Sequence, residues 1–229
     1  MPITNKIRYF YQAIKQLKST CLEIKYLDNV KIDIPFSKYK NARIIVIHDI
    51  DNKGFEDEIQ KMIDIETNYG VTSILMLRPF DTLEYYKKMF PNPVGLHETF
   101  PYRFEKGIKQ FRKYGLKPKC FSQHVATKVT NFYPEILNKL NLKYFFVDPL
   151  SFGFHFSYPL FFKPLGYQNK ILISVSGEPN KKAINEILNA ANRQKGVVAF
   201  NFHPDHLYKG DKNFKRNMES FKYLIKKLR

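Results

Sequence analysis

A short run of β-branched residues that ends abruptly in charged side chains is the strongest constraint on the fold of this chain. Residues 44–47 read Ile-Ile-Val-Ile, and His48, Asp49 and Asp51 follow almost at once. An apolar run without polar alternation is typical of a strand buried on both faces, as in a parallel sheet. Polar residues at the carboxyl end of such a strand lie where α/β folds build their sites. The sequence therefore predicts a buried strand that leads into a functional site.

Strand and helix patterns alternate along the chain from residue 43 onward. The apolar spacing predicts strands at 44–47, 71–77, 94–97, 120–124, 144–147, 170–175 and 197–202. Between these strands it predicts helices at 55–69, 82–89, 105–114, 133–140 and 182–192. Repeated β–α units with short connections indicate a parallel sheet or barrel. Because no linker or internal repeat interrupts the pattern, we expect a single α/β domain over residues 1–229, with its core at 43–208.

Three segments depart from this alternation. Residues 1–42 are predicted to form a small N-terminal extension, with a helix at 6–18 and a β-hairpin at 22–34. Residues 149–168 are rich in Phe, Pro, Ser and Gly, which indicates a long loop over the site face. Residues 209–229 carry eight Lys and Arg against two acids, and their apolar spacing predicts an amphipathic helix with a solvated basic face.

The charge of the chain bears on its partners. Lys and Arg number 38 against 21 Asp and Glu, a formal net charge of +17 that favours an anionic partner such as nucleic acid, a membrane surface or an acidic glycan. The charge is spread along the chain and no recognition motif accompanies it, so we expect no specific nucleic-acid recognition. No apolar run approaches the roughly 20 residues of a membrane span. No signal-type apolar segment follows the first charges, so we expect a cytoplasmic protein.

Cysteine usage agrees with that compartment. Cys21 and Cys120 lie far apart and form no CxxC pair. We therefore expect two buried, reduced thiols and neither a metal site nor a disulfide framework.

The candidate catalytic residues cluster at predicted strand ends. Asp49 and Asp51 are two positions apart, so an extended backbone points both carboxylates in one direction. Two such carboxylates can divide the work of a hydrolase, because one can hold a metal while the other accepts a proton from water. Four predicted strands end in a histidine or are followed directly by one, at His48, His97, His124 and His203. In a parallel barrel these ends converge, and Asp with neutral imidazole suits zinc.

Two further residues are weaker candidates. Asp148 follows the predicted strand 144–147 and could line the same face, or it could cap a turn before Pro149. His155 lies in the 149–168 loop, where it could contact a substrate or pack within the loop.

Four short motifs, found in one order, resemble the polysaccharide deacetylase superfamily in its divergent branch with His-Asp-x-Asp. They are His48-Asp49-Ile50-Asp51, Gly95-Leu96-His97-Glu98, the stretch FRKYGLKPKCFSQH at 111–124, and His203-Pro204-Asp205. The resemblance covers residues 43–208. It implies a distorted (β/α) barrel of about seven strands. It also implies metal-assisted hydrolysis of a C–N bond, usually in the N-acetyl group of an amino sugar.

The resemblance also implies roles for individual residues. Asp49 would be the general base and His203 the general acid that protonates the leaving amine. Asp51 and His97 would be ligands of a divalent metal, with zinc expected. The residues expected to contact the substrate are His48, Glu98, Asp148 and His155.

One departure from the family pattern affects the metal site. Better-known members have a second histidine four residues after the first, where this chain has Pro101. The expected third ligand is therefore His124, or else His48. No clear arginine motif that would position the general base Asp49 is found. Lys163-Pro164-Leu165-Gly166 resembles such a motif only weakly.

Alternative functions stay open at this stage. The missing histidine would suit a carbohydrate-binding relative that has lost catalysis. The net charge would suit a protein that binds nucleic acid or membrane surfaces. A hydrolase of the same kind could also act on another amide or a cyclic imide, since substrate choice lies in loops. If the substrate is a glycan, the basic surface favours an anionic one or a charged carrier.

Overall fold

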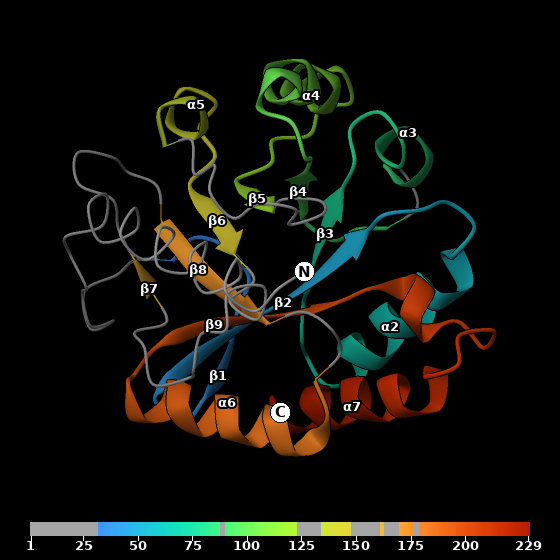
Figure 1. Cartoon of the computed structure of the whole chain (residues 1–229), viewed down its shortest axis with the longest axis vertical. Coiled ribbons are helices and arrows are strands. Elements are labelled where there is room, and N and C mark those ends of the chain that lie inside the picture. The colour runs from blue at the N-terminus through green and yellow to red at the C-terminus, as the bar shows by residue number, and fades with distance from the viewer. Residues whose placement is uncertain (1–31, 88–89, 123–133, 148–160, 163–169, 176–178) are drawn as a thin grey trace, which may run out of the picture.

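The structure is a computed structural model that describes residues 32–87, 90–122, 134–147, 161–162, 170–175 and 179–229. A curled, mostly parallel sheet lies at its centre, with helices around the outside (Figure 1). The strands are β1 (Ser37–Tyr39), β2 (Ala42–Ile50), β3 (Ile74–Leu77), β4 (Val94–His97), β5 (Cys120–Ser122), β6 (Tyr144–Val147), β7 (Phe161–Phe162), β8 (Lys170–Val175) and β9 (Val197–Phe202). The helices are α2 (Glu56–Asn68), α3 (Leu83–Tyr86), α4 (Pro101–Lys113), α5 (Pro134–Lys139), α6 (Lys181–Arg193), the 3₁₀ turn η3 (Pro204–Leu207) and α7 (Phe214–Lys227).

The strand pairings lead around the sheet and return to their starting point. Parallel ladders join β2, β3, β4, β5, β6 and β8 in that order, and β9 pairs with both β8 and β2. The short strands β1 and β7 pair antiparallel with β2 and β8. The predicted α/β class is therefore confirmed, and the pairings are consistent with the distorted barrel that the sequence motifs imply.

The predicted elements correspond closely to those observed, with two informative differences. Strands β4, β6, β8 and β9 have the predicted bounds. Strand β2, however, continues to Ile50, so His48 and Asp49 are strand residues and do not follow the strand as predicted. Helix α4 begins at Pro101 and not at residue 105, because proline is well suited to a first helical turn that needs no N–H donor.

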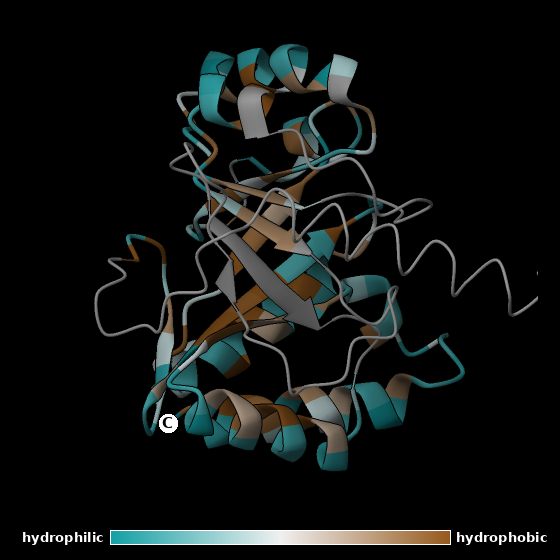
Figure 2. Ribbon diagram, turned by 60° about the vertical axis from the view of Figure 1, so that its left-hand side comes forward, coloured by the Kyte–Doolittle hydropathy of each residue, from teal (hydrophilic) through white to brown (hydrophobic). Residues whose placement is uncertain are grey.

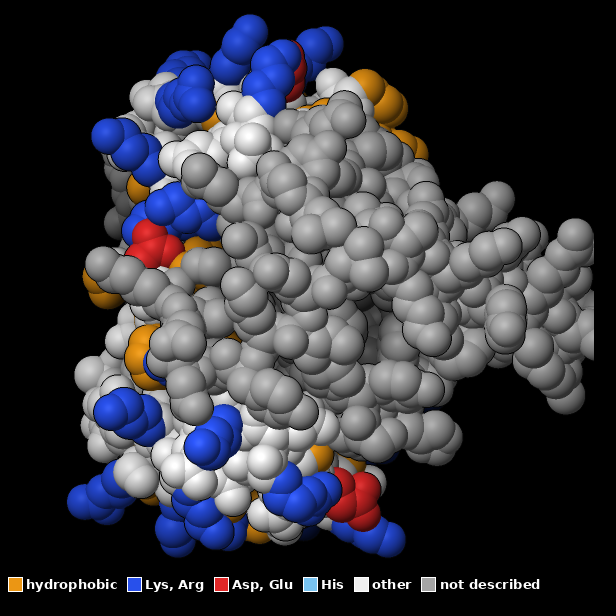
Figure 3. Space-filling view, turned by 90° about the vertical axis from the view of Figure 1, so that its left-hand side faces the viewer, with side chains coloured by type: hydrophobic (Ala, Val, Ile, Leu, Met, Phe, Trp, Pro, Cys, Tyr) orange, Lys and Arg blue, Asp and Glu red, His pale blue; other side chains and the backbone are white. Residues whose placement is uncertain are grey.

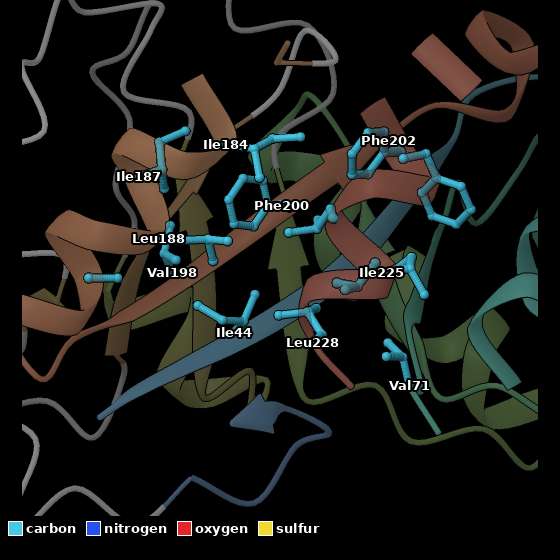
Figure 4. Close-up of a cluster of buried hydrophobic side chains, with 14 of the residues drawn as sticks. Ile44, Val71, Ile184, Ile187, Leu188, Val198, Phe200, Phe202, Ile225 and Leu228 are labelled. Carbon is cyan, nitrogen blue, oxygen red and sulfur yellow. The ribbon is translucent and has the colours of Figure 1, made fainter. Parts of the chain in front are cut away.

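Alternation along β2 assigns its side chains to two sides. Ile44 and Val46 pack outward in a cluster with α6, α7 and the outer side of β9 (Figure 4), whereas Ile45 and Ile47 pack into the interior of the curled sheet. Both faces of the strand are thus buried, as the apolar run predicts. The same alternation sends His48 outward and Asp49 inward, since successive strand side chains point to opposite faces.

The amino ends of β5 and β6 are covered by the start of the described chain. Ile34 packs in the interior cluster, and Asp33 accepts hydrogen bonds from the Tyr144 hydroxyl at 2.5 Å and from Lys119 Nζ at 3.0 Å. Lys143 Nζ lies 3.3 Å from the same carboxylate. The Tyr144 hydrogen bond, with help from the two lysines, holds the pKa of Asp33 well below its usual range. Burial, with Asp33 beside it, raises the pKa of Tyr144.

The expected N-terminal extension is described only in part. The helix at 6–18 and most of the hairpin at 22–34 lie outside the described residues. Residues 32–34 are described and are not in a strand, so the hairpin prediction is wrong at that end. The chain is not extended as a strand here. The backbone N–H of Asp33 donates to the Tyr144 hydroxyl, and Ile34 packs in the interior cluster.

The outer layer matches the sequence predictions. Helix α7 confirms the predicted basic C-terminal helix, with Phe221, Leu224 and Ile225 buried. Figure 2 shows hydrophobic strands between two helical layers whose outer surfaces are largely hydrophilic. Cys120 is a buried free thiol whose pKa is raised by burial, as expected, while Cys21 lies outside the described residues. Within the described part of the chain, no helix has the length and apolar character needed to cross a membrane.

Candidate active site

Hydrogen bonds hold both carboxylate oxygens of Asp49 in the candidate site. Its Oδ2 accepts a hydrogen bond from Asn201 Nδ2 at 2.6 Å, and its Oδ1 accepts one from the Ser122 hydroxyl at 3.0 Å. Its backbone N–H donates to Asn201 Oδ1 at 3.2 Å. Strands β9 and β5 therefore fix both carboxylate oxygens of this buried residue, which is 5% exposed. A buried carboxylate requires such donors, because leaving it unsatisfied is costly.

His97 lies between the two aspartates. Its Nδ1 is 2.6 Å from Ser122 Oγ and 3.6 Å from Asp49 Oδ1, and its Nε2 is 2.9 Å from Asp51 Oδ1. The strand end of β4 supplies this ring, and Asp51 follows the end of β2. The expectation that Asp49 and Asp51 point to one side agrees with this geometry, since one imidazole contacts both.

His203 approaches Asp49 from the end of β9. Its Nε2 lies 3.8 Å from Asp49 Oδ2, and its ring is 4.9 Å from that of His206. Residue 203 directly precedes η3, whose backbone is held by a hydrogen bond from Asn217 Nδ2 of α7 to the carbonyl of His206 at 3.1 Å. A carboxylate and a partly exposed imidazole therefore lie close together at the carboxyl end of the sheet.

His48 lies away from this group. Its Nε2 is 2.7 Å from Glu66 Oε1 of α2, and its Nδ1 is 3.3 Å from the carbonyl of Phe202. Ser73 donates to the other Glu66 oxygen at 2.6 Å, and His48 is only 1% exposed. Both ring nitrogens thus contact protein groups in the outer layer. We therefore leave His48 out of the candidate site, as a substrate contact and as a third metal ligand.

The carboxylate of Glu98 also has all of its described contacts within its own loop and the start of α4. Its Oε1 accepts from the backbone N–H groups of Thr99 at 2.8 Å and Phe100 at 3.4 Å, and its Oε2 lies 3.2 Å from Arg103 Nε. The carboxylate is buried, and its contacts shape the turn between β4 and α4. These contacts indicate a positioning role for Glu98, and its contact with a substrate stays a prediction.

The remaining candidates lie outside the described residues. These are His124, Asp148 and His155, together with almost all of the 149–168 loop.

The described residues fit a metal ion only in part. Ligands about 2.0–2.1 Å from one zinc ion lie roughly 3.3 Å apart in a tetrahedral shell, and Asp51 Oδ1 and His97 Nε2, which are 2.9 Å apart, come near this separation. Within the described chain, however, no group of three His, Cys, Asp or Glu side chains is arranged to hold a metal. The described residues thus supply a pair of donors and not a complete shell.

Two residues of the site were not predicted from the sequence. Asn201 is the single amide in the apolar strand Val197–Phe202, and Ser122 ends the short strand Cys120–Ser122. Each lies two positions before a histidine in the sequence, His203 or His124, and residues two apart in a strand point to one side. This two-residue spacing before a histidine is the sequence feature from which Asn201 and Ser122 could have been predicted.

Comparison with known proteins extends this description. No protein-family model and no curated protein matches the chain. It does share its fold with a solved structure from Bordetella bronchiseptica described as a "putative polysaccharide deacetylase involved in o-antigen biosynthesis", at a TM-score of 0.52 and 14% identity over 82% of this chain and 83% of that chain. A second, from Mycobacterium smegmatis, is described as a "putative polysaccharide deacetylase" and matches at a TM-score of 0.53 and 13% identity over 84% and 87%. The fold is therefore one that proteins with this description adopt, in agreement with the sequence motifs.

Proposed function

We propose that this protein is a hydrolase that removes the N-acetyl group from an amino sugar in a glycan. The observation that carries the proposal is the position of the Asp49 carboxylate. Donors from Asn201 and Ser122 fix it, and the imidazoles of His97 and His203 lie within 4 Å of its oxygens. A fixed carboxylate beside imidazoles is the arrangement that general acid–base hydrolysis of an amide requires.

Asp49 and His203 would divide the proton transfers. Asp49 would accept the proton of the attacking water, and the Asn201 and Ser122 hydrogen bonds keep its oxygens oriented for this step. His203, 3.8 Å from Asp49, would donate a proton to the departing nitrogen. Breaking the C–N bond in this way yields acetate and a free amine.

A divalent metal, with zinc as the first candidate, is part of the proposal. Asp51 and His97 would be two of its ligands, and His124, outside the described residues, is the proposed third. Such an ion lowers the pKa of a bound water toward neutrality and polarises the carbonyl.

The contacts of Ser122 orient the ring of His97 toward Asp51. The Ser122 hydroxyl has one proton, and if the Asp49 carboxylate accepts it, Ser122 Oγ must accept from His97 Nδ1. His97 Nε2 then faces Asp51 Oδ1 at 2.9 Å. These two atoms would be neighbouring ligands of the proposed ion.

Acetate release tests the proposed activity. Purified protein is incubated with N-acetylated oligosaccharides and each common divalent ion, and free acetate and new amino groups are measured. We expect equal amounts of both products. Release of neither from any N-acetylated glycan would contradict the proposal, and release from other amides or cyclic imides alone would keep the hydrolase but change its substrate.

One observation favours a second candidate, a carbohydrate-binding relative without catalysis. Pro101, at the position where the resembled family has a histidine, starts helix α4 and so serves the fold. Elemental analysis separates the two candidates. A divalent ion near one equivalent per chain supports the hydrolase, whereas no ion after incubation with excess zinc supports the binding protein.

A further inference from the structure

We propose that the loops after β3 and β4, together with the outer side of α4, bind a negatively charged glycan chain and lead it to the candidate active site. The proposal rests on the proposed function for the location of the catalytic groups. It adds the substrate class, a polyanionic glycan, and the surface that selects it.

Three exposed aromatic side chains form the first part of this surface, which we call the aromatic shelf. Phe80 in the loop after β3 is 42% exposed, and Phe100 and Tyr102 after β4 are 46% and 73% exposed. The rings of Phe100 and Tyr102 stack, with centroids 5.5 Å apart and planes 25° from parallel. Large aromatic side chains normally bury most of their surface, so a group of exposed rings indicates a binding surface. Flat rings suit the apolar faces of pyranose sugars.

A charge pair between a buried carboxylate and a partly exposed guanidinium holds the aromatic shelf in place. Glu98 fixes the backbone of its own loop and pairs with Arg103, as described above. The guanidinium of Arg103 in turn lies 4.6 Å from the ring centre of Phe80, in the neighbouring loop. A carboxylate that is only 5% exposed is costly unless it is paired. The contacts with the backbone and with Arg103 offset the free-energy cost of burying Glu98. They also join two loops and orient the aromatic rings.

The aromatic shelf adjoins the candidate active site. Glu98 directly follows His97 in the chain, and Phe100 is three residues from it. On the β3 side, Arg78 Nη1 donates to the backbone carbonyl of Asp51 at 3.2 Å, and Arg78 is two residues before Phe80. A sugar ring on the shelf would therefore lie beside the groups proposed to hydrolyse its N-acetyl neighbour.

The outer side of α4 supplies the charge. Its exposed cations are Lys106, Lys109, Arg112 and Lys113. Its single acid, Glu105, is already bonded to Lys139 at 2.6 Å. Tyr102, Lys106, Lys109 and Lys113 follow a helical spacing of four, three and four, so they share one side of α4 over roughly 16 Å. Figure 3 shows Lys and Arg at the end of the molecule where α4 lies and also at the opposite end. This charge is complementary to a chain of carboxylate, sulfate or phosphate groups.

The first experiment tests the aromatic shelf. Calorimetry measures binding of an N-acetylated, uronate-containing oligosaccharide to the full chain and to the double variant Phe100→Ala/Tyr102→Ala. The matched control is Phe36→Ala, because Phe36 is also exposed (36%) and lies under a guanidinium, that of Arg43 at 5.4 Å, but precedes β1 away from the site. We expect at least about tenfold weaker binding in the double variant and less than about twofold in the control.

The second experiment tests the charge. The variant Lys106→Ala/Lys109→Ala is compared with Lys222→Ala/Lys226→Ala, which removes two exposed cations from α7. We expect the α4 variant alone to lose affinity for the uronate-containing oligosaccharide. A neutral N-acetylglucosamine oligomer of equal length should bind the α4 variant as it binds the wild type. Added salt should weaken only the first interaction, because salt screens exposed charges.

The outcomes separate this inference from the proposed function. If shelf and α4 variants bind the anionic oligosaccharide as the wild type does while the wild type releases acetate, the inference is overturned and the function stands. If the variants lose binding and no protein releases acetate, the inference stands and the function fails. Binding of α4 cations to vesicles of anionic lipid, without binding to the oligosaccharide, would overturn the inference in favour of a membrane surface.

Discussion

Asn201 on β9 and Asp49 on β2 are joined in both directions across neighbouring parallel strands. The amide nitrogen of Asn201 donates to Asp49 Oδ2 at 2.6 Å, and the backbone N–H of Asp49 donates to the amide oxygen of Asn201 at 3.2 Å. The ladder pairs Asn201 with Ile47, two residues before Asp49, so the register of the two strands sets this contact. Asn201, with Ser122, thus holds the Asp49 carboxylate in a chain whose sequence shows no clear arginine motif for that task.

Replacing Asn201 by Ala should lower kcat by about 10- to 100-fold with little change in KM. The reason is that the substitution leaves Asp49 Oδ2 without its shortest hydrogen bond, worth roughly 1.5–3 kcal/mol for a charged acceptor. Steady-state acetate release measures the effect. Asn180→Ala is the matched control, because that side chain only caps α6 by accepting from the Ala183 N–H. A kcat loss of equal size in Asn180→Ala would show that general destabilisation is responsible.

The contact between His48 and Glu66 is expected to serve stability. Glu66→Ala should lower the free energy of unfolding by at least about 2 kcal/mol, because it breaks a buried pair and leaves His48 and Ser73 without their partner. Denaturant unfolding measures this loss. The fraction that stays folded should keep wild-type kcat. A fully stable Glu66→Ala protein with no activity would assign this pair to the catalytic machinery.

Asp33 should make stability depend on pH. Its pKa is lowered in the folded protein, chiefly by the Tyr144 hydrogen bond, so the unfolded chain takes up the proton first as the pH falls. The stabilisation is therefore complete above the unfolded pKa of about 4 and is lost as the pH falls from there toward the folded pKa. The difference in unfolding free energy between wild type and Asp33→Asn should shrink between about pH 5 and pH 2. A difference that stays constant over this range would contradict the assignment.

The two aspartates should respond differently when each is changed to asparagine. Asp51→Asn should lose the bound divalent ion, because it weakens one of the two adjacent donors, whereas Asp49→Asn should keep it. Elemental mass spectrometry of both variants after dialysis measures the difference. Equal retention of metal in both would remove Asp51 from the proposed ligands.

Periodicity predicted the framework well because burial governs it. The apolar run at Ile44–Ile47 is buried on both faces, and the strand Val197–Phe202 has its predicted bounds. The same reasoning erred on His48. It placed this residue after the strand, where a histidine would join the site, whereas the strand continues and its alternation turns the ring outward to Glu66. An error of three residues in the end of a strand thus reassigns a side chain to a different layer.

Contacts between strands could not be predicted from local spacing. Asn201 meets Asp49 across 152 positions and Ser122 meets it across 73, and both depend on the order of strands around the sheet. Glu98, in the motif Gly95-Leu96-His97-Glu98, was expected to contact a substrate. Nothing in the sequence pattern indicates that its carboxylate is bound in its own loop by two backbone N–H groups and Arg103. The donors that pair with a buried carboxylate are set by the conformation of the surrounding loop. The sequence pattern does not predict that conformation.

The rate of acetate release by Asp49→Asn tests the central claim most directly. Asparagine nearly matches aspartate in shape but cannot accept the water's proton, so kcat should fall by about 10²- to 10⁴-fold while the protein stays folded. Asp64→Asn is the matched control, since that carboxylate is exposed on α2 and bonded to Gln60. The account predicts wild-type kcat in Asp64→Asn and a large loss in Asp49→Asn. Wild-type acetate release by Asp49→Asn would contradict it.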